Sequence, residues 1–465
     1  MRLSHTLPVA AARFDEPNLV SAAGVVPVMR LAADAGLGEL AAAHLTVPTD
    51  KGANAGGKVT ALVCGMVAGA DSIDDMALLR HGGMGRLFDR GYAPSTLGSF
   101  LREFRFGHVR QLDAVASRLL AALAGRTRLL AAERSDMVLL DIDDSIIEVH
   151  GHAKQGAAFG YTRVRGLNML LATASTSASA PVVVAQRLRK GSSGSPRGAK
   201  RLVADALRTV KAVRGKGPVL LRADSAFYGS PTIGAAVRAG AQVSVTVRMT
   251  PNIKTAIASI ADDAWTTIEY TDAIVDEQTG ELISRAEVAE VPFTAFAAGK
   301  KAEQVPGRLV VRRIPDFNAP ADPNQASLFE LWRFHAFFTT TDPEVLDTVA
   351  ADKIHRGHAV IEQVHADLKN SALAHLPSGN FMANSAWLAL AVKAFNLTRA
   401  AGTMAGDRFT RATTGTIRRT LISVPARVAS SARRLTLHLP RDWPWEKQWT
   451  ALFTRTSGPP AAATP

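Results

Sequence analysis

The segment Met137–Asp143 constrains the fold of this 465-residue sequence most, because it is an apolar run that carries Asp141 and ends in Asp143. Such a run is typical of a strand buried on both faces of a sheet. Residues two apart on a strand project to one face, so Asp141 and Asp143 share a face and Asp144 projects to the other. Two carboxylates on the same side of a strand end are suited to a divalent cation.

The residues after this strand predict two more strands, then a helix, a strand, a helix and a last strand. The apolar run of the fourth strand ends in Asp224, as that of the first ends in Asp143. Open α/β sheets commonly bind ligands at the carboxyl ends of their strands, so both acids could reach one metal ion. We expect these six elements at residues 167–171, 182–185, 199–213, 218–224, 231–239 and 243–247.

A third acid lies in segment 352–370, which has helical spacing. An apolar stripe suited to packing on a sheet runs beside a polar stripe that contains Glu362, so Glu362 would face the same cleft as the aspartates. Oxygen ligands alone favour Mg²⁺ or Mn²⁺ over Zn²⁺, and two such ions can serve phosphodiester chemistry. The apolar stripe contains Ile354, Ile361, Val364 and Leu368, and the polar stripe contains His355, His358, Glu362, His365 and Lys369.

The rest of the chain surrounds this α/β core. Helical spacing and Gly-rich breaks predict a helical region over residues 22–130. Alternation and turns between residues 250 and 342 predict a β-rich insertion. More specific expectations are a helix that starts at Pro94 and leaves Arg110 available to solvent, a hairpin tip at 276–280, a half-buried strand at 332–338 and a helix at 385–401.

The charge of the chain favours an anionic partner. Lys and Arg number 54 against 41 Asp and Glu, which gives a net charge of +13 and a pI near 10.1. Nucleic acid and membrane headgroups both fit that charge. Residues 401–465 hold ten basic residues against three acids. The single cysteine, Cys64, and the lack of an apolar stretch near the ~18 residues needed to span a bilayer predict a soluble cytosolic protein.

These residues together resemble the DDE-type transposases of bacterial insertion sequences, in the group with a Y-x2-R-x3-E-x6-K signature. The resemblance implies an RNase H-like core in which Asp143, Asp224 and Glu362 are the catalytic acids and hold Mg²⁺, for which Mn²⁺ can substitute. It also implies that Lys369 contacts phosphates at the element ends, and that a homodimer at the bacterial nucleoid cuts its terminal inverted repeats and joins them to target DNA. The resemblance rests on residues 68–75, 94–97, 140–145, 222–228, 362–369 and 384–387 and on the Arg/Trp-rich C-terminal region.

Two positions of the signature depart from the family pattern. His355 stands where the family has Tyr, and His358 stands where it has Arg. Arg356 could supply the missing guanidinium, although it projects ~200° away from His358 on an ideal helix. We expect His355, Arg356, His358 and Lys369 to be the DNA-binding residues of this segment.

The resemblance also predicts how the chain is divided. We expect an α/β protein with a helical N-terminal DNA-binding region at 1–135, an RNase H-like core at 136–248 and 343–402, a β-rich insertion at 249–342 and a basic C-terminal region at 403–465.

Two other functions fit parts of the sequence. Asp141, Asp143 and Ser145 approximate the D-x-D-x-T motif of haloacid-dehalogenase-type phosphatases, in which Asp141 would be the nucleophile. The strand that follows opposes this function, because the phosphatase fold needs a helix directly after its first strand. The other candidate is a catalytically silent DNA-binding protein derived from a transposase. In a transposase, Asp141 would lie behind the metal ligands or serve as one of them.

Overall fold

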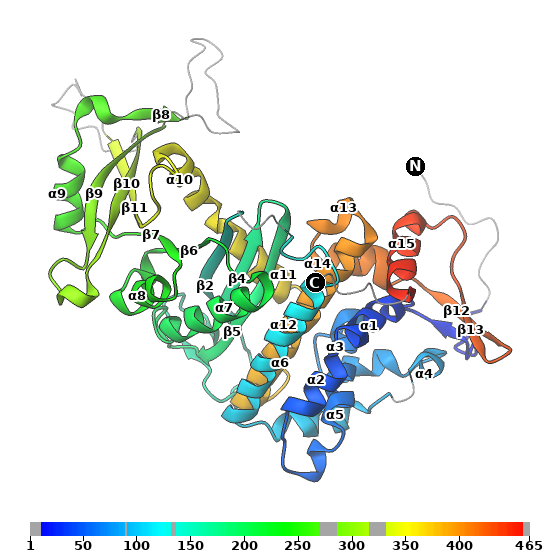
Figure 1. The fold of residues 1–465 in the computed structure, drawn as a ribbon. Coiled ribbons are helices and arrows are strands. Elements are labelled where there is room, and N and C mark those ends of the chain that lie inside the picture. The colour runs from blue at the N-terminus through cyan, green and yellow to red at the C-terminus, as the bar shows by residue number, and fades with distance from the viewer. Residues whose placement is uncertain (1–10, 89–90, 132–135, 269–285, 316–331, 459–465) are drawn as a thin grey trace.

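Residues 11–88, 91–131, 136–268, 286–315 and 332–458 are described by the computed structural model (Figure 1). They form a mixed α/β fold with a 10-stranded sheet and a separate 3-stranded sheet. The large sheet contains β2 (Val138–Glu148), β3 (Ala158–Phe159), β4 (Arg165–Thr176), β5 (Ser179–Lys190), β6 (Val219–Ala223), β7 (Gln242–Thr246), β8 (Thr266–Ile268), β9 (Ala286–Ala295), β10 (Val305–Pro315) and β11 (Trp332–Thr339). The small sheet contains β1 (Leu19–Val20), β12 (Ala426–Ser431) and β13 (Arg434–His438).

The predicted order of the core elements is confirmed. Strands β2, β4 and β5 pair antiparallel, and then α7 (Ala199–Arg214) leads to β6 and α8 (Ser230–Arg238) leads to β7. Strands β6 and β7 run parallel to β2, which gives the order β5-β4-β2-β6-β7. The first three strands are longer than the apolar runs that predicted them, because hydrogen bonding continues into the flanking polar residues.

The β-rich insertion continues the core sheet. Strand β11 pairs antiparallel with β7, and β10, β9 and β8 follow it outward. The expected alternation along β11 ends at Ala336, because Phe337 on the second face packs against Ala351 of α10 (Thr348–Arg356). A short helix, α9 (Pro251–Ala258), lies beside β9 (Figure 1). The expected hairpin tip at 276–280 lies outside the described residues.

Helices join the sheet to the N-terminal part of the chain. The longest, α12 (Phe381–Ala405), is apolar on nearly all sides and buried along most of its length. It packs against β5 on the core and against α3 and α6 of the N-terminal region, so it lies at the centre of the molecule (Figure 1). The other helices are α1 (Val25–Asp34), α2 (Leu37–His44), α3 (Ala55–Ala68), α4 (Met84–Leu87), α5 (Pro94–Arg102), α6 (Phe106–Ala124), α11 (Val360–Lys369), α13 (Asp407–Thr410), α14 (Thr414–Ile417) and α15 (Glu446–Ser457).

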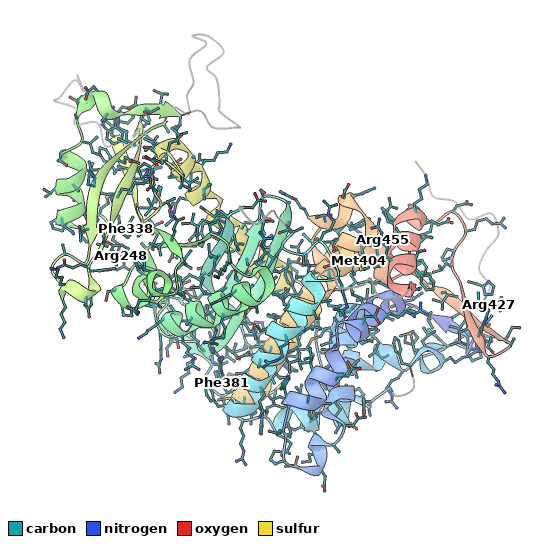
Figure 2. The ribbon with its side chains drawn as sticks, viewed as in Figure 1. Arg248, Phe338, Phe381, Met404, Arg427 and Arg455 are labelled. Atoms are coloured by element: carbon teal, nitrogen blue, oxygen red, sulfur yellow. The ribbon has the colours of Figure 1, made fainter. Side chains whose placement is uncertain are left out.

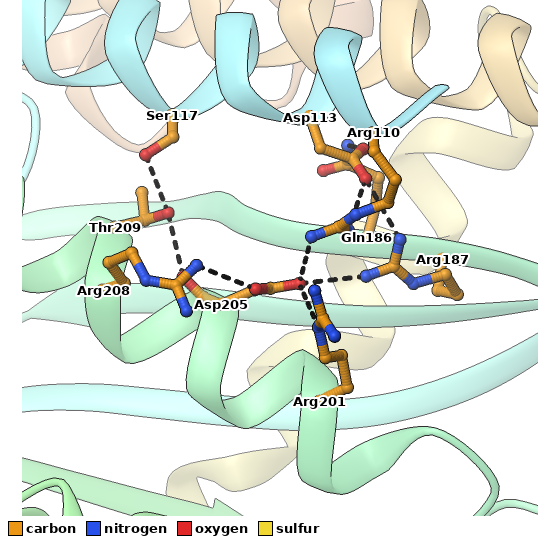
Figure 3. A network of polar contacts seen from close by, with 9 residues as sticks. All are labelled: Arg110, Asp113, Ser117, Gln186, Arg187, Arg201, Asp205, Arg208 and Thr209. Carbon is orange, nitrogen blue, oxygen red and sulfur yellow. Dashed lines mark hydrogen bonds and ion pairs between the residues drawn. The ribbon is translucent and has the colours of Figure 1, made fainter. Parts of the chain in front are cut away.

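A partly buried polar network fixes α6 on the core (Figure 3). The Arg110 guanidinium donates to Asp113 at 2.7 Å and to Asp205 of α7 at 2.8 Å. Arg187 of β5 donates to the same two carboxylates at 3.1 and 3.0 Å. The sequence prediction that Arg110 is available to solvent holds only in part, because its side chain is 24% exposed and its guanidinium is paired with Asp113 and with Asp205 from a distant part of the chain. No helix among the described residues is long and apolar enough to cross a bilayer.

Candidate active site

Two acids lie side by side where β6 ends next to the middle of the parallel strand β2. Ile142 pairs with Ala223 in the register of these strands, so Asp143 and Asp224 are the next residue on each. Paired residues of parallel strands project to the same face, which brings the two carboxylates together. A backbone N–H from Ala226 donates to Oδ1 of Asp224 at 3.0 Å and orients that carboxylate.

The surroundings of these acids disfavour two uncompensated negative charges. Burial raises the pKa of Asp143 to about 6, and repulsion from Asp224 adds to the effect. The pKa of Asp224 is also raised, chiefly because protein partly desolvates its carboxyl group. A cation bound between the two would relieve both effects.

Helix α11 covers the face of β2 that carries these acids. This helix and the turn before it contact three residues that follow one another on that face of β2, namely Asp141, Asp143 and Ser145. His358, just before the helix, lies with Nδ1 3.1 Å from Oδ1 of Asp141. Nε2 of His365 lies 3.6 Å from Oδ2 of Asp143. The Lys369 ammonium donates to Oγ of Ser145 at 2.6 Å and is close enough to Asp143 to interact with its charge.

Asp141 is held in a buried ion pair instead of facing the cleft. Nε and Nη2 of Arg222 each lie 2.7 Å from one of its oxygens, and Asp141 is 0% exposed. The third nitrogen of Arg222 donates to the carbonyl of Ile354. Asp141 therefore lies behind Asp143, and it cannot be the solvent-accessible nucleophile of a phosphatase. Strand β4 also follows β2 where that fold would need a helix.

The expected helix over 352–370 is interrupted. Helix α10 ends at Arg356 and α11 begins at Val360, with one 3₁₀ turn at Gly357–Ala359 between them. The turn brings the backbone close to the core, because a Cβ at Gly357 would lie 2.8 Å from Nη1 of Arg222. Residues on either side of the break therefore do not follow one continuous helical stripe.

This break separates His355 from the other polar residues. Its ring stacks on Phe337 at 4.0 Å, and its nitrogens hydrogen-bond Ser244 and Thr246 of β7 at 2.8 and 3.0 Å. Burial lowers the pKa of His355 to about 3. The DNA contact expected for His355 does not fit this placement, because both nitrogens already have partners within the protein.

Arg356 is also engaged within the fold. Its Nε donates to Asp352 at 2.8 Å, and Asp352 is 2% exposed. His358, two residues later, is the residue of this segment whose ring lies 3.1 Å from Asp141. The expectation that Arg356 supplies the missing guanidinium at this point is not supported. The guanidinium nearest to Asp141 is that of Arg222.

Glu362 lies in the first turn of α11 and is exposed. On α11 it precedes His365 by three residues and Lys369 by seven, so it lies toward the helix face that those two residues share. Within the described ranges, no three His, Cys, Asp or Glu side chains are grouped closely enough to hold a metal ion. The donor chemistry of Asp143 and Asp224 nevertheless fits Mg²⁺, since both offer carboxylate oxygens under mutual repulsion.

Sequence reasoning missed the roles of His365 and Arg222. His365 is 4% exposed, and neither of its ring nitrogens has a hydrogen-bond partner among the described residues. Burial lowers its pKa to about 3, so the ring is neutral beside Asp143. Its spacing, three residues after Glu362 and four before Lys369, was the available signal. For Arg222 the signal was its place two residues before Asp224 on a buried strand.

Comparison with known families agrees with this geometry. The family model described as transposase DDE domain, group 1, matches residues 6–458. The chain therefore belongs to this family of transposases, whose activity in general is DNA cleavage and strand transfer. No curated protein matched the chain.

Proposed function

We propose that this protein is a transposase that cuts DNA at the terminal inverted repeats of its element and joins the ends to target DNA. The observation that carries this proposal is that Asp143, in the middle of β2, lies next to Asp224, directly after the parallel strand β6, beneath a helix that brings Lys369 to the same face. The strand order β5-β4-β2-β6-β7 supports an RNase H-like core. The signature group with a tyrosine and an arginine remains a proposal, because this chain has histidines at both positions.

Asp143 and Asp224 would hold divalent cations in this proposal, with Glu362 joining them when DNA is bound. Bound Mg²⁺ or Mn²⁺ would activate the attacking oxygen and stabilise the leaving oxygen. Lys369 offers an ammonium group to a DNA phosphate next to the acids. His358 would face the same phosphate from the other end of the cleft. Synapsis of two element ends requires two copies, so we propose a homodimer on DNA.

The remaining regions would serve DNA binding. The helices of residues 1–135 and the basic region of residues 403–465 pack together through α1 and α15. The insertion of residues 249–342 extends the sheet that carries the acids, so it would lie along the same DNA. The core is divided by that insertion into residues 136–248 and 343–402. This arrangement suits a protein that acts on DNA in the bacterial nucleoid.

Cleavage of a plasmid that carries the element ends tests the proposal. Asp143→Asn, Asp224→Asn and Glu362→Gln should each lower Mg²⁺-dependent cleavage by about a thousandfold. Glu148→Gln is the matched control, because Glu148 is an exposed acid at the far end of β2. Cleavage by Asp224→Asn at the rate of the control would refute the site. A wild-type chain that binds the ends and never cuts them would favour the silent DNA-binding alternative.

A further inference from the structure

The hairpin of β12 and β13 is the most basic exposed element at the C-terminal end. From Ala426 to Arg441 it contains four arginines, one histidine and no acid. All four arginines are exposed, and in the part of the chain that the structure describes none of them forms an ion pair. They are Arg427, Arg433, Arg434 and Arg441.

Three other arginines of the C-terminal region, Arg411, Arg418 and Arg455, donate hydrogen bonds to backbone carbonyls. The Arg455 guanidinium donates to the carbonyl of Met404 (Figure 2). Arg418 donates through Nε to the carbonyl of Val67 at 3.4 Å, and Arg411 donates to the carbonyl of Ser177. Among the exposed cations of this region, Arg427, Arg433, Arg434 and Arg441 lie on or directly after the hairpin, while Arg408, Arg419 and Lys447 lie on separate elements.

The hairpin has one apolar face and one cationic face. Val428 pairs with Leu437, and Val428 is buried while Leu437 lines a cavity of about 1190 Å³ beside the N-terminal helices. Arg427 pairs with His438, and Ser431 pairs with Arg434, so these side chains project to the opposite face. The apolar face fixes the hairpin on the protein and leaves the cationic face outward.

The hairpin is also anchored at its base. Strand β1 pairs with β12 through Leu19 and Arg427, and Arg86 donates to the carbonyl of Val428 at 3.1 Å. Figure 2 shows Arg427 at the opposite end of the molecule from Phe338, which belongs to the insertion. The hairpin is thus anchored to the protein and lies well away from β2 and β6, the strands that position Asp143 and Asp224 (Figure 1).

The tip of the hairpin is unusual. Ala432 and Arg433 form a two-residue turn in which both have positive φ, at 48° and 62°. Such turns favour Asn and Gly, because other side chains are strained in this region. Arg433 occupies a position where glycine would cause less backbone strain. Strained residues of this kind cluster at functional sites.

We propose that the β12–β13 hairpin binds the sugar-phosphate backbone of duplex DNA through Arg433 and Arg434, independently of base sequence. A two-stranded ribbon fits a DNA groove, and arginine pairs with phosphate through charge-assisted hydrogen bonds. This inference rests on the proposed function, since it assumes that the protein acts on DNA. It adds a site of DNA affinity separate from the site of chemistry.

Fluorescence anisotropy with the full chain and a labelled duplex of arbitrary sequence tests the inference. Arg433→Gln/Arg434→Gln should raise the Kd roughly tenfold, and should reduce the slope of log K against log salt by about 2. Lys211→Gln/Lys216→Gln is the control, because it removes two exposed cations from the end of α7 and beyond. The control should change the Kd and the salt slope by less than about half of the change caused by the arginine variant.

A second variant separates DNA binding from folding. Ala432→Asn/Arg433→Gly installs the favoured turn, so the protein should be more stable while its Kd rises roughly threefold. An unchanged Kd and salt slope in both hairpin variants overturns the inference and leaves the proposed function standing. An equal loss in the lysine control overturns it too, because the effect would then be one of net charge. A wild-type chain that binds no duplex overturns the proposed function itself.

Discussion

Arg222 and Asp141 form a buried, two-pronged ion pair that joins the first two parallel strands of the core beneath the candidate active site. The pair occupies opposed positions in the β2–β6 register, and the two residues are 2% and 0% exposed. Through the carbonyl of Ile354, the same guanidinium also holds the segment that precedes α11. The pair therefore links the strands that lead to Asp143 and Asp224 to α10, the helix that precedes the one carrying Lys369.

Removing one partner of this pair should destabilise the fold strongly. Arg222→Met leaves the Asp141 carboxylate buried without its guanidinium, and we expect the free energy of unfolding to fall by about 3–5 kcal/mol. Asp141→Leu/Arg222→Met removes both charges and should recover most of that loss. Urea unfolding of the two variants measures the difference. If the single variant were as stable as the wild type, the pair would not hold the strands together.

The close approach of Gly357 to Arg222 gives a second prediction. Gly357→Ala places a methyl group 2.8 Å from Nη1 of Arg222, so the ion pair or the 3₁₀ turn must shift. We expect a loss of about 1–3 kcal/mol in unfolding free energy. Gly107→Ala is the control, because Gly107 lies in α6 with open space around it, and alanine there should stabilise by up to ~1 kcal/mol. Equal effects at the two glycines would contradict the account.

Because Lys393 of α12 is buried, the free energy of unfolding should depend on pH. Its ammonium is 1% exposed and donates to the carbonyl of Ala389, and burial lowers its pKa from 10.5 to about 7. Between those values the unfolded chain binds a proton that the folded chain does not, so this lysine makes stability rise with pH from about 7 to about 10. Lys393→Met should therefore be more stable than wild type by about 4 kcal/mol at pH 7, and the gain should vanish near pH 10.

Chemical unfolding of wild type and Lys393→Met at several pH values measures this gain. Parallel pH profiles for the two proteins would show that Lys393 is not buried as described.

His365 should affect function more than stability. Its ring packs 3.6 Å from Asp143 and has no hydrogen-bond partner among the described residues, so His365→Leu should unfold within about 1 kcal/mol of wild type. Losing a neighbour that positions Asp143 should raise the Mg²⁺ concentration for half-maximal cleavage by about tenfold or more. A titration of cleavage rate against Mg²⁺ tests this. A changed maximal rate with no change in the Mg²⁺ requirement would argue against the positioning role.

The core strands could be predicted because burial on both faces leaves a direct sequence signal. Met137–Asp143 and Pro218–Asp224 are apolar runs that end in acids, and both became adjacent parallel strands. The pairing of Asp141 with Arg222 could not be predicted in the same way, because strand register depends on contacts between segments about eighty residues apart. The sequence places both residues on strands without saying that they face each other.

The polar side of segment 352–370 was predicted less well. A single helical period placed His355 with His358, but the 3₁₀ turn at Gly357 changes the direction of the chain. The partners of His355 are Ser244 and Thr246 on β7, which periodicity along one segment cannot reveal. The β12–β13 hairpin was missed as well, because its Ala432–Arg433 turn lacks the glycine or asparagine that signals a tight hairpin.

The most direct test of the central claim, that Asp224 is a metal ligand for DNA cleavage, is a change of metal preference. Asp224→Cys replaces carboxylate oxygen with sulfur, which binds Mg²⁺ poorly and Mn²⁺ better. The only native cysteine, Cys64, does not interfere, because burial raises the pKa of its thiol to about 12. We predict that wild-type protein cleaves end-containing DNA with either metal and that Asp224→Cys cleaves it with Mn²⁺ alone. Cleavage by Asp224→Cys at the wild-type rate in Mg²⁺ would contradict the claim.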